Sequence, residues 1–247
     1  TQSDYRAIVG ESLGLIYGYE FDGIYQVDDF YTSAATGKLI LKPGITNNTR
    51  YDGGAAPGVV KYKDQNGDGK ITTADRTVIG NAMPKWFGGI TNSFSFKGID
   101  FSFMLQYSYG NDVFNATRQF ATGSQDQRYN MLAEVGDRWW PSNASNKVPS
   151  TKGYVKGDVY SRFVEDGSFL RLKNMTLGYS LPKKWINKIH ISKLRIYGTA
   201  QNLFCISGYS GYDPEVSTAA SNPMTPGLDW GAYPKSRVFT FGLDVQF

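Results

Sequence analysis

The sequence predicts an all-β fold, with about six antiparallel strands forming one arc of a transmembrane β-barrel wall. Strand-length segments alternate apolar and polar residues with period two, and the connections between them alternate between long and short. Aromatic residues make up 15% of the 247 residues, together with 28 glycines. No run approaches the roughly 18 consecutive apolar residues of a membrane helix. Barrel strands escape that test because every second residue faces the lumen.

The first strand is expected within residues 12–25, where Leu13, Leu15, Tyr17 and Tyr19 alternate. The second is expected at 86–97. Ile90, Phe94 and Phe96 share one face of this strand, with Asn92 as an exception.

The third strand, at 99–109, has the cleanest alternation inside the chain. One face carries Ile99, Phe101, Phe103, Leu105, Tyr107 and Tyr109. The opposite face carries Asp100, Ser102, Gln106 and Ser108. Lys97-Gly98 predicts a tight hairpin before this strand, because glycine readily adopts a positive φ.

Two further strands, at 168–181 and 193–204, flank Pro182. In the first of them Met175, Leu177, Tyr179 and Leu181 share a face, but Arg171 and Lys173 have the same parity. Either a β-bulge resets the register there, or that half of the strand stands above the membrane.

The last strand, at 237–247, has an apolar face and a polar face and ends on an aromatic residue. Such a strand fits a barrel wall, although a sandwich strand with a core face has the same pattern. The residues expected to face lipid are Phe101, Phe103, Leu105, Phe239, Phe241, Leu243, Val245 and Phe247.

Loop lengths give the predicted orientation. Residues 26–85, 110–167 and 205–236 form long connections, whereas 97–98 and 182–189 are short. Outer-membrane barrels have short periplasmic turns and long extracellular loops. We therefore expect the three long loops to be extracellular and Phe247 to end at the periplasmic rim.

The segment from Asp64 to Asp75 matches a calcium-binding loop. Oxygen donors stand at positions 1, 3 and 5, and Gly69 stands at position 6, where the chain must turn sharply. The predicted Ca²⁺ ligands are Asp64, Asn66, Asp68, the carbonyl of Lys70, Thr72 and Asp75. Asp75 replaces the usual longer glutamate. An Asx-rich solvated turn is the alternative interpretation.

Several loop aromatics are candidates for contacting a substrate, namely Trp139, Trp140, Tyr212 and Trp230. Aromatic rings bind sugars and peptides, but they also pack long loops onto themselves.

Composition disfavours other classes. A single histidine, His190, argues against a His-based catalytic triad or a His-cluster metal site, and no carboxylate pair or nucleophile elbow indicates an enzyme. The net charge of +4 comes from scattered basic residues, which does not support nucleic-acid binding. Cys205 is the single cysteine and cannot form an internal disulfide. No signal peptide stands at Thr1, so we expect either that it was removed or that the chain is a piece of a longer protein.

An ordered series of short motifs resembles the carboxy-terminal part of a SusC/RagA-type TonB-linked outer-membrane transporter. The motifs are Leu15–Tyr25, Pro57-Gly58, Lys61–Asp64, the calcium loop, Ile79-Gly80, Pro84, Gly88-Gly89, Tyr109–Asn111, Arg138-Trp139, Ser168–Asn174, Leu177–Tyr179, Ala200–Phe204, Gly211–Pro214 and the terminal strand. Each motif is weak alone, but the ordered set is specific.

The resemblance implies that the chain supplies the last six or so strands of a barrel of about 22. It also implies a plug and a TonB-contacting segment outside this chain, a SusD-like surface lipoprotein as lid, and import of oligosaccharides or peptides. Two alternatives stay open: a secreted, calcium-stabilised β-sandwich that binds carbohydrate, and a barrel recruited as a structural subunit of a larger outer-membrane assembly.

Overall fold

The computed structural model describes residues 4–123, 129–186, 190–218, 222 and 224–247. The chain forms two compact units. The sheet unit comprises Pro84–Asn111, Asp166–Glu215 and Ala232–Phe247. The loop unit comprises Thr1–Met83, Asp112–Glu165 and Val216–Gly231.

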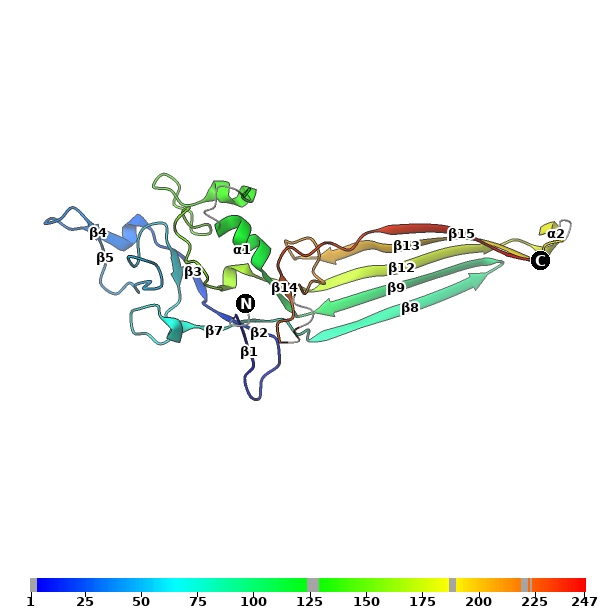
Figure 1. The fold of residues 1–247 in the computed structure, drawn as a ribbon, viewed down its shortest axis with the longest axis horizontal. Coiled ribbons are helices and arrows are strands. Elements are labelled where there is room, and N and C mark those ends of the chain that lie inside the picture. Colours follow the sequence, from blue (N-terminus) through cyan, green and yellow to red (C-terminus); the bar gives the residue numbers. More distant parts are fainter. Residues whose placement is uncertain (1–3, 124–128, 187–189, 219–221, 223) are drawn as a thin grey trace. The chain divides into compact units, whose positions relative to one another are not determined.

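The sheet unit is built on one five-stranded sheet with the order β15-β13-β12-β9-β8 (Figure 1). Every neighbouring pair is antiparallel. The strands are β8 (Trp86–Phe96), β9 (Ile99–Tyr109), β12 (Phe169–Ser180), β13 (Lys193–Ser207) and β15 (Val238–Gln246). These five lie at the positions that the period-two pattern indicates, and β13 extends to Ser207 instead of 204.

Short connections join the strands at one end of the sheet. Lys97 and Gly98 have φ values of 48° and 85°, so both central residues of the β8–β9 hairpin have positive φ, as they do in the type I′ turns that commonly close two-residue hairpins. Helix α2 (Lys183–Ile186) follows β12. Residues 187–189 of the predicted 182–189 turn lie outside the described residues.

A bulge explains the parity of the basic residues in β12. The register shifts between Leu172 and Asn174 against both β9 and β13. Arg171 therefore pairs with Gln106 on the polar face, while Leu172 pairs with Leu105 on the apolar face. Of the two interpretations of this strand, the structure shows the bulge.

The register places one apolar surface across all five strands. Phe241 stands opposite Gly198, which stands opposite Leu177, and that residue in turn stands opposite Phe101. The described strands carry no charged residue on this face, and Asn92 is its polar exception. Its side chains are uncovered, with Phe241 85% and Leu243 67% exposed. An apolar sheet face of this extent needs a nonaqueous environment or a partner.

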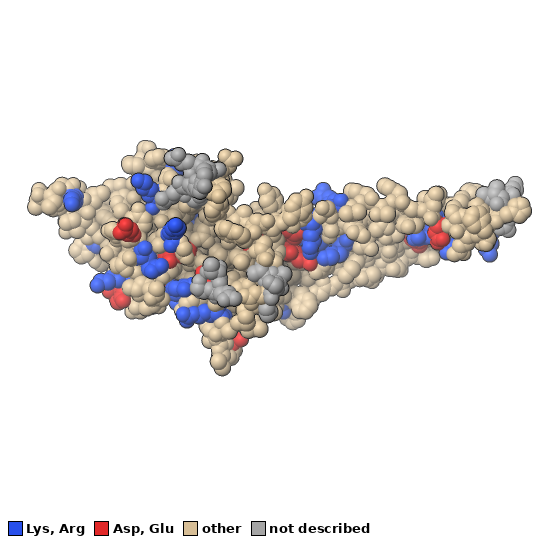
Figure 2. Space-filling model, in the orientation of Figure 1, with Lys and Arg blue, Asp and Glu red and all other residues tan. Residues whose placement is uncertain are grey.

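The opposite face of the sheet is polar and carries ion pairs. The Arg195 Nε lies 2.8 Å from Asp100 Oδ1 across Gly178. Near the other end of β12, Arg171 is buried and pairs with Asp213. Figure 2 shows charged side chains of the sheet in two groups with an uncharged stretch between them.

The loop unit consists of short strands and one two-turn helix. Its helix is α1 (Ala116–Gly123), and among the described residues no helix is long and apolar enough to span a membrane. Its strands are β1 (Tyr5–Arg6), β2 (Leu15–Gly18), β3 (Phe21–Ile24), β4 (Phe30–Thr32), β5 (Leu39–Leu41), β6 (Val60–Tyr62), β7 (Thr77–Asn81), β10 (Asp112–Asn115), β11 (Val164–Asp166) and β14 (Leu228–Asp229). They form two three-stranded sheets and two two-stranded sheets, β3-β6 and β4-β5.

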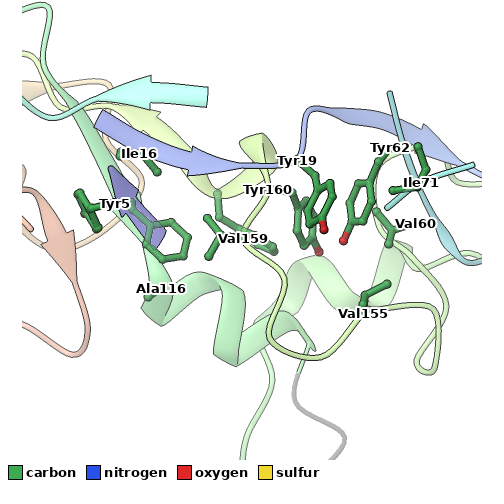
Figure 3. Close-up of a cluster of buried hydrophobic side chains, with 12 residues drawn as sticks. Tyr5, Ile16, Tyr19, Val60, Tyr62, Ile71, Ala116, Val155, Val159 and Tyr160 are labelled. Carbon is green, nitrogen blue, oxygen red and sulfur yellow. The ribbon is translucent and has the colours of Figure 1, made fainter. Parts of the chain in front are cut away.

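A tyrosine cluster fills the core of the loop unit (Figure 3). Tyr19 stacks on Tyr62 with ring centroids 4.8 Å apart, and Tyr62 lies 5.4 Å from Tyr160. All three side chains are buried. Segments distant in the sequence therefore pack onto one another, which gives these long connections a core of their own.

The prediction of one wall strand at 12–25 is wrong. The segment forms two short strands: β2 pairs with β1 and β7, and β3 pairs with β6. Gly18 approaches the Val159 carbonyl so closely that a Cβ there would collide, and Gly23 has a φ of 98°. The sheet therefore holds five strands where the sequence predicts six.

Candidate functional site

The predicted calcium loop lies in the loop unit between β6 and β7. Gly67 and Gly69 adopt φ values of 74° and 80°. These left-handed conformations let the chain fold back around Asp64. Asp64 Oδ1 accepts the Gly67 N–H at 2.7 Å, and its Oδ2 accepts the Gly69 N–H at 2.8 Å.

The same hydrogen bonds act on the charge of Asp64. Desolvation raises the pKa of this carboxyl, the N–H donors of Gly69 and Gly67 lower it, and the net shift is downward. The group is therefore ionised at neutral pH, as a calcium ligand must be.

Asp75 closes the loop in a way that the sequence pattern did not indicate. Its carboxylate is buried and accepts the Thr72 N–H at 2.7 Å and the Gln65 N–H at 3.1 Å. With Thr72 it forms a capping box on the short 3₁₀ turn Thr73–Asp75. These contacts are those of an Asx-rich turn. No group of three or more acidic, histidine or cysteine side chains converges in the described residues, so calcium binding stays a prediction.

The four candidate aromatics do not form one site. Trp139 is buried, and its Nε1 donates to Gln26 Oε1 at 2.9 Å. Arg138 lies 4.2 Å from the Trp140 ring. Tyr212 belongs to the sheet unit and is exposed. Of the four, Trp230 lines the large cavity of the loop unit.

This cavity has a volume of about 820 Å³. Helix α1 forms one wall through residues at helical spacing, and Asn115 caps that helix by accepting the Arg118 N–H at 2.8 Å. The lining residues are Asp4, Phe114, Ala116, Gln119, Phe120, Gly123, Tyr154, Val155, Lys156, Gly157, Val159, Leu228 and Trp230.

Salt bridges fix the helix that forms this wall. Arg118 contacts Glu134 at 2.7 Å and Glu165 at 3.0 Å. The hydrogen bonds that Arg118 donates to the Glu134 carboxylate are the largest cause that holds the pKa of Arg118 above its usual range. The cavity wall is therefore attached to two other segments of the loop unit.

Sequence reasoning indicated neither α1 nor the cavity. The walls come from residues more than a hundred positions apart, such as Phe120 and Leu228, and no motif joins them. The spacing of Ala116, Gln119, Phe120 and Gly123 is the one available signal, and it covers two turns only.

The chain is similar to proteins named TonB-dependent receptors. The chain is 34% identical to TonB-dependent receptor P3 of Formosa agariphila over 243 residues, which is 96% of this chain and 22% of that protein. It is 32% identical to TonB-dependent receptor SusC of Bacteroides thetaiotaomicron over 199 residues, covering 80% of this chain and 18% of SusC. No family model matches the sequence.

The chain belongs to the SusC-type TonB-dependent receptors. The solved RagAB peptide transporter has the same fold, with a TM-score of 0.67, 24% identity, and coverage of 94% of this chain and 23% of that one. A "closed-closed" RagAB structure also gives a TM-score of 0.67, with 23% identity and coverage of 99% and 25%. The chain thus spans about a quarter of the length of these proteins.

Family membership confirms part of the sequence interpretation. The fold is part of an antiparallel transmembrane barrel, and the protein is located in the outer membrane. The secreted-sandwich alternative is wrong, because sandwich faces meet each other in a core, whereas the apolar face of this receptor sheet is uncovered. The named relatives are receptors and transporters, which agrees with a chain that is not an enzyme.

Proposed function

We propose that this chain supplies wall strands and extracellular loops to a nutrient importer of the outer membrane. The imported substrate is an oligosaccharide or a peptide. Energy comes through TonB, which contacts a part of the receptor outside this chain, and a SusD-like surface lipoprotein covers the barrel.

The five-stranded sheet is the observation that carries this proposal. Its apolar face carries no charged residue among the described strands, and its other face holds ion pairs. A barrel wall has the same two faces, an apolar one toward lipid and a polar one toward the lumen. β8 and β15 are the edges of the sheet. Their unpaired backbone groups favour continuation into the rest of the same barrel.

Uptake by cells tests the proposal. A strain lacking the gene should lose accumulation of a labelled oligosaccharide or peptide mixture, and the complete gene should restore it. Accumulation should also stop when TonB is removed, because the resemblance implies energy from the inner membrane.

The same strains separate transport from a structural role. A structural subunit of a larger assembly would leave uptake unchanged in the deletion strain while the assembly itself is lost from the outer membrane. That outcome would reject import as the function.

The loop from Asp64 to Asp75 is proposed to bind one structural Ca²⁺. All its candidate donors are oxygen atoms, as Ca²⁺ requires, and the chain already wraps around the ionised Asp64. The side chains of Asp64, Asn66 and Asp68 would hold the ion with the Lys70 carbonyl, and Thr72 and Asp75 would complete the site. The ion would tie the strands on either side of the loop together.

A further inference from the structure

We propose that Asn66 is a site of spontaneous deamidation, at which the Gly67 backbone nitrogen is the nucleophile and the hydrogen bonds of the loop restrain the reaction. The inference goes beyond the proposed import function and does not depend on whether the loop holds Ca²⁺. Its product is an aspartate or an isoaspartate at position 66, with one more negative charge in the loop.

The sequence places the two reacting groups next to each other. Asn66-Gly67 is the one place in the 247 residues where glycine follows asparagine. The side-chain Cγ of an asparagine and the next backbone nitrogen close a succinimide ring when they bond. Because glycine carries no Cβ, its nitrogen is the least hindered nucleophile that a following residue can offer.

The structure leaves both residues open to water. Asn66 and Gly67 are exposed, and a Cβ built on Gly67 would meet no atom within 4 Å apart from its chain neighbours. No neighbouring side chain therefore blocks the ring as it closes. Water also reaches the succinimide, which must be hydrolysed to give the product.

The reaction balances with water as the one co-reactant. The Gly67 nitrogen bonds to Cγ of Asn66 and gives up its proton to solvent, and the side-chain nitrogen takes a proton from solvent and leaves as ammonia. Water then cleaves one of the two bonds between carbon and nitrogen in the ring. Cleavage at Cγ leaves aspartate, and cleavage at the backbone carbonyl carbon leaves isoaspartate.

Hydrogen bonds hold both reacting groups in the folded loop. The Gly67 N–H donates to Asp64 Oδ1 at 2.7 Å, and Asn66 Oδ1 accepts the Asp68 N–H at 2.9 Å. Asn66 Nδ2 also donates to Asp68 Oδ2 at 3.2 Å. The nitrogen must leave Asp64, and the asparagine side chain must turn until Cγ faces that nitrogen. These bonds therefore slow the reaction without preventing it.

The two products affect the loop differently. Aspartate keeps the backbone as it is and adds a carboxylate beside Asp68. Isoaspartate inserts an extra methylene group into the chain before Gly67. The Gly67 and Gly69 N–H groups both donate to Asp64, so this longer connection displaces one donor relative to the other.

Peptide mapping by mass spectrometry of the complete receptor tests the inference. The receptor is kept in detergent with a calcium chelator at mildly alkaline pH, and the deamidated fraction is followed over time. The reference is Asn143, an exposed asparagine of the same unit that precedes alanine. We expect Asn66 to react severalfold faster than Asn143 and to give isoaspartate together with aspartate.

Variants separate the nucleophile from the restraint. Asp64→Ala removes the acceptor of the Gly67 N–H and should raise the rate at Asn66 about fivefold, the ratio for loss of one typical hydrogen bond from the resting loop. Asp52→Ala, at an exposed acidic residue outside the loop, is the matched control and should leave the rate unchanged. Asn66→Gln should give no modification, because its longer side chain would have to close a larger ring.

Each half of the proposal has its own contrary result. Deamidation at Asn66 that is no faster than at Asn143, or a product without isoaspartate, would reject attack by the Gly67 nitrogen. A rate in Asp64→Ala equal to or below that of the unaltered receptor would reject restraint by the loop. Import is measured by uptake, so its failure is detected independently of both results.

Discussion

The hydroxyl groups of Tyr19, Tyr62 and Tyr160 are buried in the loop unit and have no hydrogen-bond partner among the described residues. Their hydroxyl oxygens point in the same direction (Figure 3). Burial raises the pKa of Tyr62 well above its usual range, so this hydroxyl stays neutral. A buried neutral hydroxyl without a partner costs about 1–3 kcal/mol.

Replacing Tyr62 with phenylalanine should therefore leave the stability of the receptor unchanged or raise it by about 1 kcal/mol, because the aromatic stack is retained. The measurement is denaturant unfolding of the loop unit within the complete receptor, followed by limited proteolysis. Tyr25→Phe is the matched control. The Tyr25 hydroxyl donates to the Thr46 carbonyl, so its loss should destabilise by about 1 kcal/mol. A larger loss at Tyr62 than at Tyr25 would show that the Tyr62 hydroxyl has a partner.

At two glycines of the sheet, a neighbouring side chain occupies the space that a Cβ atom would need. A Cβ at Gly178 would lie 2.5 Å from Arg195 Nη2 and 2.6 Å from Asp100, so the ion pair occupies that space. A Cβ at Gly242 would collide with the Tyr197 ring, which covers this glycine from the neighbouring strand. The sequence places Gly242 on the polar face but does not reveal that the position is crowded.

At the scale of elements, β15 offers positions on opposite faces of the sheet for testing orientation. Leu243→Arg should impair membrane assembly strongly, because a lipid-facing arginine costs roughly 2–4 kcal/mol at the midplane. Thr240→Arg should be tolerated, since Thr240 is exposed on the polar face and stands opposite Thr199. The measurement is the amount of folded receptor in isolated outer membranes. Equal amounts for both variants would contradict the assigned faces.

The second prediction at this scale concerns Ca²⁺ binding by the loop from Asp64 to Asp75. Titration of metal-free receptor with Ca²⁺ should show binding to one site in the loop, and removal of the ion should lower the melting temperature because a ligand of the native state stabilises it. Asp64→Ala should abolish the binding, whereas Asp52→Ala, an exposed acidic residue outside the donor set, should not. Wild-type receptor that melts at the same temperature with Ca²⁺ and with chelator would count against the site.

The long strands could be predicted because a period-two pattern over about ten residues is a local property. The segment 12–25 has the same alternation, yet Gly18 and Gly23 adapt it to close contacts with distant segments. The donor positions of the calcium loop could also be predicted, because they follow from residue spacing within one short segment. The burial of Asp75 and the cavity around Phe120 depend on contacts between remote residues, which one sequence does not display.

At the scale of the whole receptor, thiol labelling tests the topology. In a Cys205→Ser background, a cysteine at Gln65 should react with an impermeant reagent on intact cells. A cysteine at Lys184 in α2 should react only after the outer membrane is permeabilised, because α2 lies in the short connection after β12. Both positions are exposed. Labelling at Lys184 but not at Gln65 would invert the orientation.

The central claim is that one face of the sheet contacts lipid. Spin labels at Thr240, Phe241 and Leu243 of the complete receptor in bilayers test it most directly, because neighbouring residues of a strand point to opposite faces. We predict high accessibility to oxygen, which concentrates in lipid, at Phe241 and Leu243, and high accessibility to a water-soluble nickel chelate at Thr240. Equal oxygen accessibility at the three positions, or the reverse pattern, would contradict a membrane wall.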